Sequence, residues 1–182
     1  RNLCGDITHV QAFMSRPSFR KKAGDLMVSV NSIHVRFAND AVGYLFSQRG
    51  DAVMGYGGWW SIEVGGTRGT FRIENCVEKL IYQPAPGAES VANPAALSFG
   101  EAGKPVEINT GVTDFGTTFP NRIHAFLEDV TNGVPKSKLR ASGRDALATL
   151  EYTWAAIESY EQGGILVRPA PLPPLARDPA KP

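Results

Sequence analysis

The first two thirds of the chain alternates apolar and polar residues with a period of two, which is typical of half-buried β-strands. From Asp6 to Arg16, for example, Val10 and Ala12 fall on one face and His9 and Gln11 on the other. Patterns of this kind predict strands over residues 6–16, 26–37, 41–48, 59–64, 70–75, 77–83 and 105–110.

Short turn signals separate several of these strands. Asn39 and Asp40 both tolerate a left-handed backbone, so residues 26–48 are predicted to form a hairpin. The glycine-rich run 65–69 supplies the positive backbone angles that a second hairpin needs. Connections this short favour antiparallel pairing, because a parallel crossover requires a dozen or more residues. Pro105 makes the last predicted strand an edge strand.

The pattern then changes to a period of 3.6, which predicts two helices. Thr118 is the expected N-cap of the first helix and Gly133 its stop. Its apolar stripe contains Phe119, Ile123, Phe126, Leu127 and Val130. The second helix begins at Ser142, where Asp145 three residues later resembles a capping box, and ends at residues 163–164. Its expected buried stripe contains Leu147, Leu150, Trp154 and Ile157.

Many strands followed by two helices predict an α+β fold. We expect a large, predominantly antiparallel open sheet with the two C-terminal helices packed on one face. Residues 1–168 would form a single domain, in which residues 165–167 add a last short strand. Residues 169–182 are rich in proline, which predicts an extended tail rather than a packed element.

Composition narrows the possible partners. The 182 residues include 19 Lys and Arg and 18 Asp and Glu, a formal net charge of +1. This balance argues against binding to nucleic acid or to an acidic membrane surface. No apolar run approaches the roughly 20 residues of a membrane span. Cys4 and Cys76 are the two cysteines, and without an apolar leader in the first residues we interpret them as reduced thiols of a cytoplasmic protein.

The sequence offers few catalytic or cofactor motifs. Both glycine clusters, 55–58 and 65–69, sit between predicted strands, whereas a phosphate cradle needs a helix N-terminus behind it. The three histidines are His9, His34 and His124, and none has the i, i+4 partner typical of a metal site. His9 and His34 lie on the polar face of strands. They either make ordinary hydrogen bonds there or bind hydroxyl groups and transfer protons.

The order of four segments resembles a known family. Residues 5–10 are similar to its entry into the sheet, residues 35–43 to its central hairpin, and residues 62–74 to its "i-x-G-x-x-G-x-l-x-i" hairpin. Residues 141–167 are similar to its closing helix and strand. Together the segments resemble the C-terminal domain of the glucose-fructose oxidoreductase, inositol dehydrogenase and rhizopine-catabolism (Gfo/Idh/MocA) family, over about residues 5–169.

The resemblance implies a role as well as a fold. In this family one sheet surface helps to form the sugar or polyol pocket, and the sheet mediates subunit association. Full-length members also carry an N-terminal nucleotide-binding domain and oxidise or reduce a carbinol carbon with NAD or NADP. The chain would then be a substrate-binding and oligomerisation domain. It would bind no cofactor alone, and it would use NAD or NADP if a nucleotide-binding domain were supplied.

Two departures from the family leave the catalytic residues unassigned. The given residues contain no nucleotide-binding half, and residues 15–24, without a histidine, stand where the family places a helix with an Asp and a catalytic His. Either this branch has lost that helix or a segment is missing from the sequence. The residues that remain as candidates for binding a polyhydroxy substrate are Gln11, Arg16 and His34. The chain alone is expected to be inactive and to form a homo-oligomer through the sheet face. The alternatives are a stand-alone scaffold or a small-ligand-binding module that has lost the catalytic helix.

Overall fold

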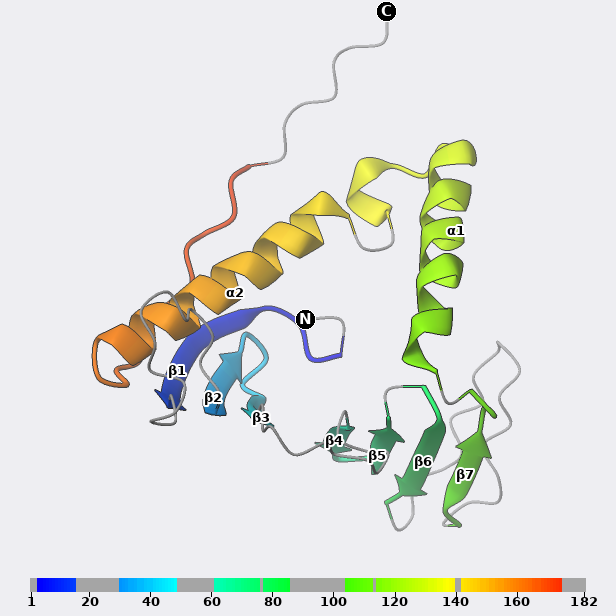
Figure 1. Ribbon diagram of the computed structural model, residues 1–182, viewed down its shortest axis with the longest axis horizontal. Coiled ribbons are helices and arrows are strands. Elements are labelled where there is room, and N and C mark those ends of the chain that lie inside the picture. Colours follow the sequence, from blue (N-terminus) through cyan, green and yellow to red (C-terminus); the bar gives the residue numbers. More distant parts are fainter. Residues whose placement is uncertain are drawn as a thin grey trace, which may run out of the picture. The chain divides into compact units, whose positions relative to one another are not determined.

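The computed structural model describes residues 3–15, 30–48, 61–75, 77–85, 104–112, 114–139 and 142–174, and Figure 1 labels its elements. The chain divides into two compact units, Arg1–Asp51 with Asn132–Pro182 and Ala52–Thr131. The described elements of the first unit are β1 (Ile7–Ser15), β2 (Val30–Phe37), β3 (Val42–Gln48), the 3-10 turn η3 (Lys136–Lys138) and α2 (Gly143–Glu161). Those of the second unit are β4 (Ile62–Gly66), β5 (Gly69–Glu74), β6 (Lys79–Pro84), β7 (Val106–Asn109), the 3-10 turn η2 (Phe115–Thr117) and α1 (Thr118–Thr131).

Strands β1, β2 and β3 form an antiparallel sheet in that order. The predicted hairpin between β2 and β3 is confirmed: Phe37 N–H donates to the Ala41 carbonyl at 2.8 Å, and Asp40 has a φ of 66°. In the β1–β2 register Val10 lies opposite Val35. Because opposite residues share a face, Val10 and Ala12 of β1 lie on the same side of the sheet as Ile33 and Val35 of β2.

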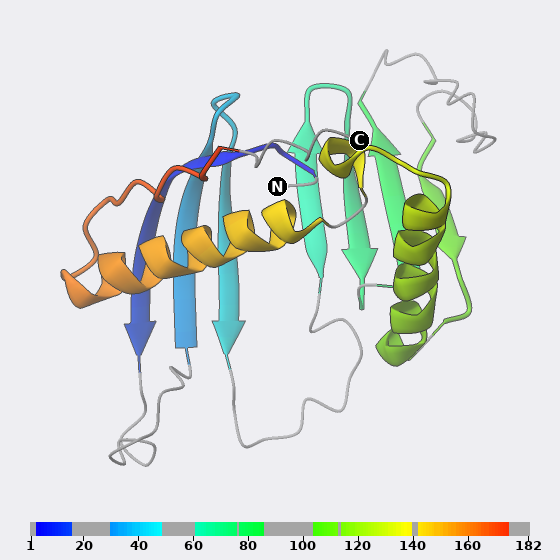
Figure 2. The ribbon, with the colours of Figure 1, turned by 90° about the horizontal axis from the view of Figure 1, so that it is seen from above.

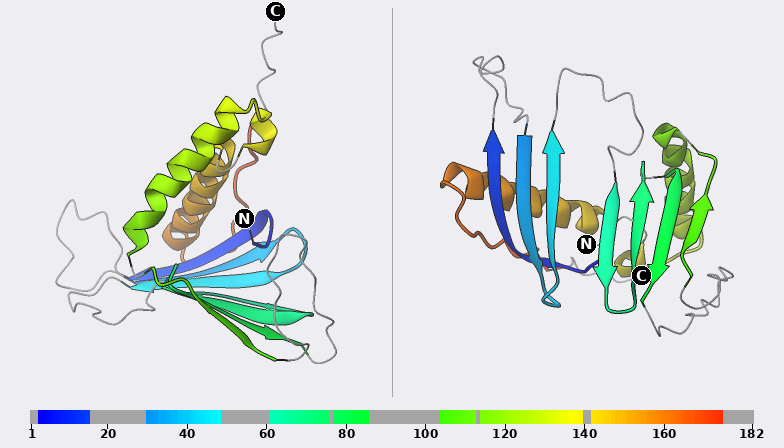
Figure 3. Two further views of the ribbon diagram at one scale, coloured as in Figure 1. Left: turned by 90° about the vertical axis from the view of Figure 1, so that its right-hand side faces the viewer. Right: turned by 90° about the horizontal axis from the view of Figure 1, so that it is seen from below.

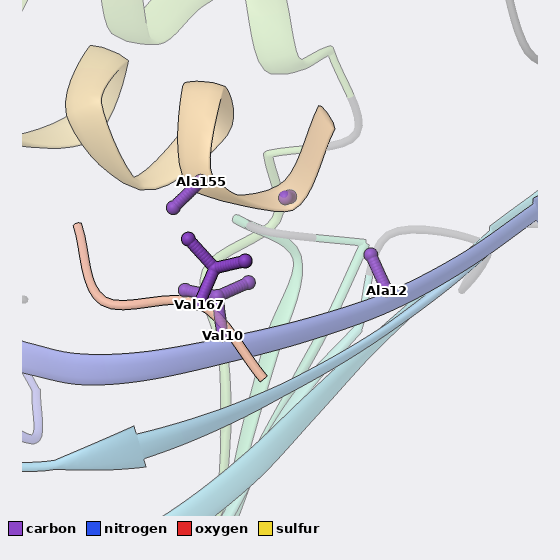
Figure 4. Close-up of a cluster of buried hydrophobic side chains, with 5 residues drawn as sticks. Val10, Ala12, Ala155 and Val167 are labelled. Atoms are coloured by element: carbon purple, nitrogen blue, oxygen red, sulfur yellow. The ribbon is translucent and has the colours of Figure 1, made fainter. Parts of the chain in front are cut away.

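Helix α2 runs across the strands of this sheet (Figure 2) and covers its apolar side. Five buried residues make the core, and Figure 4 shows β1 and α2 contributing to it side by side. They are Val10, Ala12, Ala155, Ala156 and Val167. Val10 and Val167 also exchange backbone hydrogen bonds of 2.8 Å, so the residues after α2 pair with the outer edge of β1. The predicted strand over residues 165–167 is therefore reduced to a single bridge.

The buried face of α2 differs from the one that the sequence predicts. Leu150 and Trp154 expose 50% and 57% of their surface, so the expected stripe through them is wrong. The fully buried residues of the helix are Ala148, Ala155, Ala156 and Ser159. These small side chains recur at helical spacing and let the helix backbone approach β1 closely, which larger side chains would prevent.

The ends of α2 follow the sequence prediction. Ser142 Oγ accepts a hydrogen bond from Asp145 N–H, and Asp145 Oδ2 accepts one from Ser142 N–H at 3.0 Å, so the capping box is confirmed. At the other end, Gly163 and Gly164 have φ angles of 81° and 87°. Glycine adopts such angles without the steric penalty that other residues incur, and the chain turns back there toward β1.

The second unit contains an antiparallel sheet in the order β4, β5, β6, β7. Thr67 and Arg68 form the turn of the β4–β5 hairpin, and β7 pairs with β6 alone among the described strands, as the edge strand that Pro105 predicts. Lys79 of β6 and Glu107 of β7 are diagonal neighbours, since Lys79 lies opposite Asn109, and 2.8 Å separates Lys79 Nζ from Glu107 Oε1. The hydrogen bond that Lys79 donates to this carboxylate, together with the negative charge of Glu107, raises the pKa of Lys79 above its ordinary value.

Helix α1 begins directly after η2, so Thr118 is its first residue rather than its N-cap. Gly133, with a φ of 65°, follows its last turn, as predicted.

The α+β class with open antiparallel strands is confirmed. The described strands form two sheets rather than one. In Figure 1, α1 rises away from the strands of its own unit, and its predicted apolar stripe is exposed. The single domain over residues 1–168 stays a prediction.

Candidate functional site: the open face of the first sheet

The side of the β1–β3 sheet that faces away from α2 is the candidate site, and we call it the open face (Figure 3, right). Strand alternation places every second residue of the three strands on it. Its residues are His9, Gln11 and Phe13 from β1, Ser32, His34 and Arg36 from β2, and Val42, Tyr44 and Phe46 from β3. The open face therefore combines hydrogen-bonding groups with aromatic rings.

Pairing of the strands brings two of the three candidate residues together. Gln11 lies opposite His34, and His34 lies opposite Tyr44, so an amide, an imidazole and a phenol form one row across the sheet. Neighbouring strands lie about 4.8 Å apart, which allows one small ligand to contact adjacent members of such a row. The third candidate, Arg16, lies outside the described residues.

Gln11 is half-buried, and its amide is already engaged. Its Nε2 donates to the carbonyl of Gly164 at 2.7 Å, in the turn that follows α2. This bond ties β1 to the closing turn and fixes the orientation of the side chain. Gln11 therefore has a structural role beside any role in binding.

The two histidines differ in their surroundings. His34 is exposed, and its Nε2 lies 3.4 Å from Ser32 Oγ on the same strand. His9 is half-buried with its Nδ1 3.1 Å from Thr8 Oγ1, and that hydroxyl donates to the Arg36 carbonyl. In each case the hydrogen-bonding partners set which ring nitrogen carries the proton and where the hydroxyl hydrogen points. His34 is the better placed of the two to meet the hydroxyl group of a ligand.

Arg36 adds a positive charge to the open face, but its guanidinium is paired. Nη2 lies 2.7 Å from Asp40 Oδ1 in the β2–β3 turn, and both side chains are largely exposed. Exposed pairs of this kind contribute about 0–1 kcal/mol, so the pair can open when a ligand or another surface approaches.

The aromatic and aliphatic part of the open face is its least expected feature. Phe13, Val42, Tyr44 and Phe46 expose between 55% and 80% of their surface. An exposed apolar patch of a few hundred Å² marks an interaction site more often than plain surface. The sequence analysis selected polar residues only. The alternation of Val42, Tyr44 and Phe46 within the predicted strand was the signal that could have identified this patch.

Other kinds of site find no support in the described part of the chain. No group of three or more His, Cys, Asp or Glu residues that could hold a metal ion occurs among the described residues. None of the described helices combines the length and the apolar character needed to cross a bilayer. A shallow hollow beside α1 is lined by Asn121, His124, Ala125 and Glu128, three of them polar residues on one helix.

The sequence matches no protein-family model and no curated protein. The structure does have relatives. Levoglucosan dehydrogenase in complex with NADH and levoglucosan superposes with a TM-score of 0.70 at 19% identity, over 96% of this chain and 47% of that enzyme. An inositol dehydrogenase homologue from Azotobacter vinelandii, complexed with NAD+, gives 0.58 at 13% identity, over 89% and 43%. Aldose-aldose oxidoreductase from Caulobacter crescentus, complexed with glycerol, gives 0.60 at 14% identity, over 90% and 42%.

The chain has the fold of one part of these oxidoreductases. The likeness covers most of this chain but less than half the length of each enzyme, and identities below 20% establish the fold alone. The resemblance to the Gfo/Idh/MocA C-terminal domain that the sequence indicates is thereby confirmed for the fold. Within this fold, the open face is the part of the described sheet that carries both the candidate polar residues and the exposed aromatic rings.

Proposed function

We propose that this chain is the substrate-binding and oligomerisation part of an NAD(P)-dependent sugar or polyol oxidoreductase. The observation that carries this proposal is how much of this chain, and how much of each enzyme, the structural match covers. About nine tenths or more of this chain superposes on each enzyme, while 42–47% of each enzyme is matched. A nucleotide-binding domain, on the same polypeptide or on another, would supply the cofactor that performs hydride transfer.

The described residues do not fit a dinucleotide. The glycine-rich run 65–69 closes the β4–β5 hairpin, and another strand follows it instead of a helix. A pyrophosphate site needs the N–H groups of a helix N-terminus behind such a loop. We therefore assign no step of hydride transfer to residues of this chain.

The contribution of this chain would be to bind and orient hydroxyl groups. His34 can donate to or accept from a hydroxyl, the Gln11 amide can do the same, and Arg16 can donate to an oxygen. Tyr44, beside His34, offers a ring face for the C–H side of a sugar and a phenol for its hydroxyls. These groups are the proposed substrate contacts, and the particular sugar or polyol is left open.

The aromatic part of the open face supports self-association. Phe13, Val42, Tyr44 and Phe46 present an apolar surface that a second copy could bury in a face-to-face contact. We propose a homo-oligomer joined through this surface, in the cytoplasm. Substrate binding and oligomerisation then use one face and share Tyr44, so that subunit contact also shields the site from water.

Two measurements test the proposal. Calorimetric titration of the 182-residue chain with NAD and NADP should show no binding, whereas the natural polypeptide that contains it should bind one of them and oxidise or reduce sugars or polyols. Micromolar binding by the chain alone would place the cofactor site here and contradict the proposal. Natural polypeptide that neither binds nicotinamide cofactor nor turns over any sugar would exclude the oxidoreductase role.

A second candidate is a scaffold or small-ligand-binding module without catalysis. The observation that favours it is the engaged amide of Gln11, which serves the fold through its bond to Gly164. Sedimentation separates the cases when combined with the titration. The scaffold is supported if the chain forms a dimer or larger species and the natural polypeptide shows neither cofactor binding nor turnover. A monomer contradicts oligomerisation for both candidate functions.

A further inference from the structure

Residues 168–174 form the described part of the proline-rich tail, and their sequence alone restricts their backbone. In order they are Arg168, Pro169, Ala170, Pro171, Leu172, Pro173 and Pro174. Each of these residues is a proline, directly precedes a proline, or both. Proline fixes φ at about −65°, and the residue before a proline is restricted to extended backbone. The segment is therefore held close to a polyproline II helix before any partner binds.

The same prolines prevent the tail from continuing as a strand. Four of the seven residues are prolines, which have no N–H group to donate to a ladder. The pairing with β1 accordingly ends at the bridge between Val10 and Val167, and the structure assigns neither strand nor helix to residues 168–174. A segment of this kind offers proline rings and carbonyl oxygens to a partner instead of ladder hydrogen bonds.

One edge of this segment is anchored on its own unit. Arg144, in the first turn of α2, donates a hydrogen bond from Nη1 to the carbonyl of Pro173. Pro169 and Leu172 are half-buried, and they share an edge because a polyproline II helix has three residues per turn. Figure 2 shows the chain after α2, in orange and red, running back alongside that helix. The anchored edge thus fixes the direction of the segment on the surface.

The other two edges of the segment are exposed. Arg168, Pro171 and Pro174 follow one another at intervals of three residues and form one edge, and Ala170 and Pro173 form the other. The first edge spans about 19 Å from Arg168 to Pro174, at roughly 3.1 Å per residue. It presents a positive charge at one end, followed by two proline rings with the Pro-x-x-Pro spacing.

We infer that residues 168–174 are a recognition segment for a partner protein whose groove is lined by aromatic side chains and carries an acidic group at one end. Pro-x-x-Pro segments bind such grooves because their helix is already formed and loses little entropy on binding. Pro171 and Pro174 would enter the groove, and the acidic group would pair with Arg168. The inference goes beyond the proposed function and does not depend on it, since no residue of the segment belongs to the open face.

Calorimetric titration of the natural polypeptide that contains the chain tests the inference, with isolated SH3 domains that bind Arg-x-x-Pro-x-x-Pro peptides as the probes. We expect binding at micromolar concentration, at least tenfold weaker when Pro171 and Pro174 are both replaced by alanine. Replacing Pro169 and Leu172 by alanine is the matched control on the anchored edge and should change the affinity less than threefold. Equal losses for the two double variants, or binding to none of the probes, would overturn the inference.

Reversal of the charge at Arg168 tests the acidic end of the groove. Arg168→Glu should weaken probe binding at least tenfold, whereas Arg168→Lys keeps the charge and should retain most of the affinity. Binding to the unsubstituted polypeptide should also weaken as the salt concentration rises. If Arg168→Glu binds the probes as tightly as the unsubstituted polypeptide, the charge is not recognised and the inference is wrong.

Two outcomes would assign the segment another role. If alanine at positions 171 and 174 dissociates an oligomer of the chain in sedimentation velocity, the segment binds a second copy. If the same variant unfolds at least 5 °C lower than the unsubstituted chain, these prolines serve the fold. Either result contradicts the inference. Loss of probe binding with the oligomeric state and the melting temperature unchanged supports it.

Discussion

Ser159 of α2 provides the hydrogen-bond acceptor for the backbone of Ala12 in β1. The Ala12 N–H donates to Ser159 Oγ at 2.9 Å, and the same hydroxyl donates to the Ile165 carbonyl. Ser159 has no exposed surface. One side chain thus replaces the strand that would otherwise pair with the outer edge of β1, and it joins the helix, the sheet and the closing segment.

We expect Ser159→Ala to destabilise the chain by about 1–3 kcal/mol, because it leaves the buried Ala12 N–H without an acceptor. Urea denaturation followed by circular dichroism measures the difference. Thr153→Ala is the matched control, since Thr153 also bonds a backbone carbonyl of α2 but is exposed. Equal losses for the two variants would mean that the Ser159 bonds add nothing specific.

A methyl group at position 164 should be tolerated poorly. A Cβ on Gly164 would lie 2.5 Å from Cε1 of Phe13, whereas one on Gly163 would meet nothing within 4 Å. Both glycines have positive φ, so each alanine substitution carries a backbone penalty of about 1–2 kcal/mol. Gly164→Ala should therefore lower the free energy of unfolding by about 1–3 kcal/mol more than Gly163→Ala does, because of the added clash. Thermal or urea unfolding measures the difference.

The clash with Phe13 can be isolated by a double-mutant cycle. Phe13→Ala removes the ring, so it should lower the cost of Gly164→Ala toward that of Gly163→Ala. Purely additive losses would show that the backbone angle, and not the ring, limits position 164.

The proposed oligomer depends on one face of β3. Tyr44 lies on the open face, and its neighbour Leu45 points to the opposite side of the same strand. Tyr44→Lys should shift the chain toward monomer in sedimentation velocity, with at least a tenfold weaker association, because it places a charge within the apolar contact. Leu45→Lys should leave the distribution unchanged. Dissociation by Leu45→Lys alone would move the interface to the other side of the sheet.

The Lys79–Glu107 pair predicts a small pH effect at alkaline pH. The raised pKa of Lys79 means that the folded state holds this proton more tightly than the unfolded chain does. The associated stabilisation is therefore complete below the ordinary lysine pKa and is lost as pH rises through the raised value. Glu107→Gln should lower the pKa of Lys79 toward its ordinary value, measured by NMR titration of the lysine side-chain signals. An unchanged pKa would mean that Glu107 does not cause the shift.

Much of the secondary structure is visible in the sequence because its causes are local. Alternation with a period of two identified the strands, and the ends of α2 follow from the Ser142 capping box and the glycines 163 and 164. The N-cap assigned to Thr118 was wrong because η2 precedes the helix and supplies its first turn. That 3-10 turn has no clear pattern of apolar residues to reveal it.

The candidate site was predictable in part. Gln11 and His34 were selected from separate strands, and the β1–β2 register places them opposite one another. The aromatic patch of Phe13, Tyr44 and Phe46 was missed, since an apolar residue in a strand is equally consistent with burial. The exposure of these rings depends on which face of the sheet the helix covers, and the sequence of a strand alone does not determine that face.

The sequence by itself determined that this chain makes antiparallel strands followed by two helices, because hydrogen-bond periodicity and turn chemistry act over a few residues. The tertiary structure decided which sides of those elements meet. It buried Ala148, Ala155 and Ser159 where Leu150 and Trp154 were expected. Close approach of a helix to a sheet depends on the fit between two surfaces distant in sequence, and the small residues of α2 fit β1 where the large ones cannot.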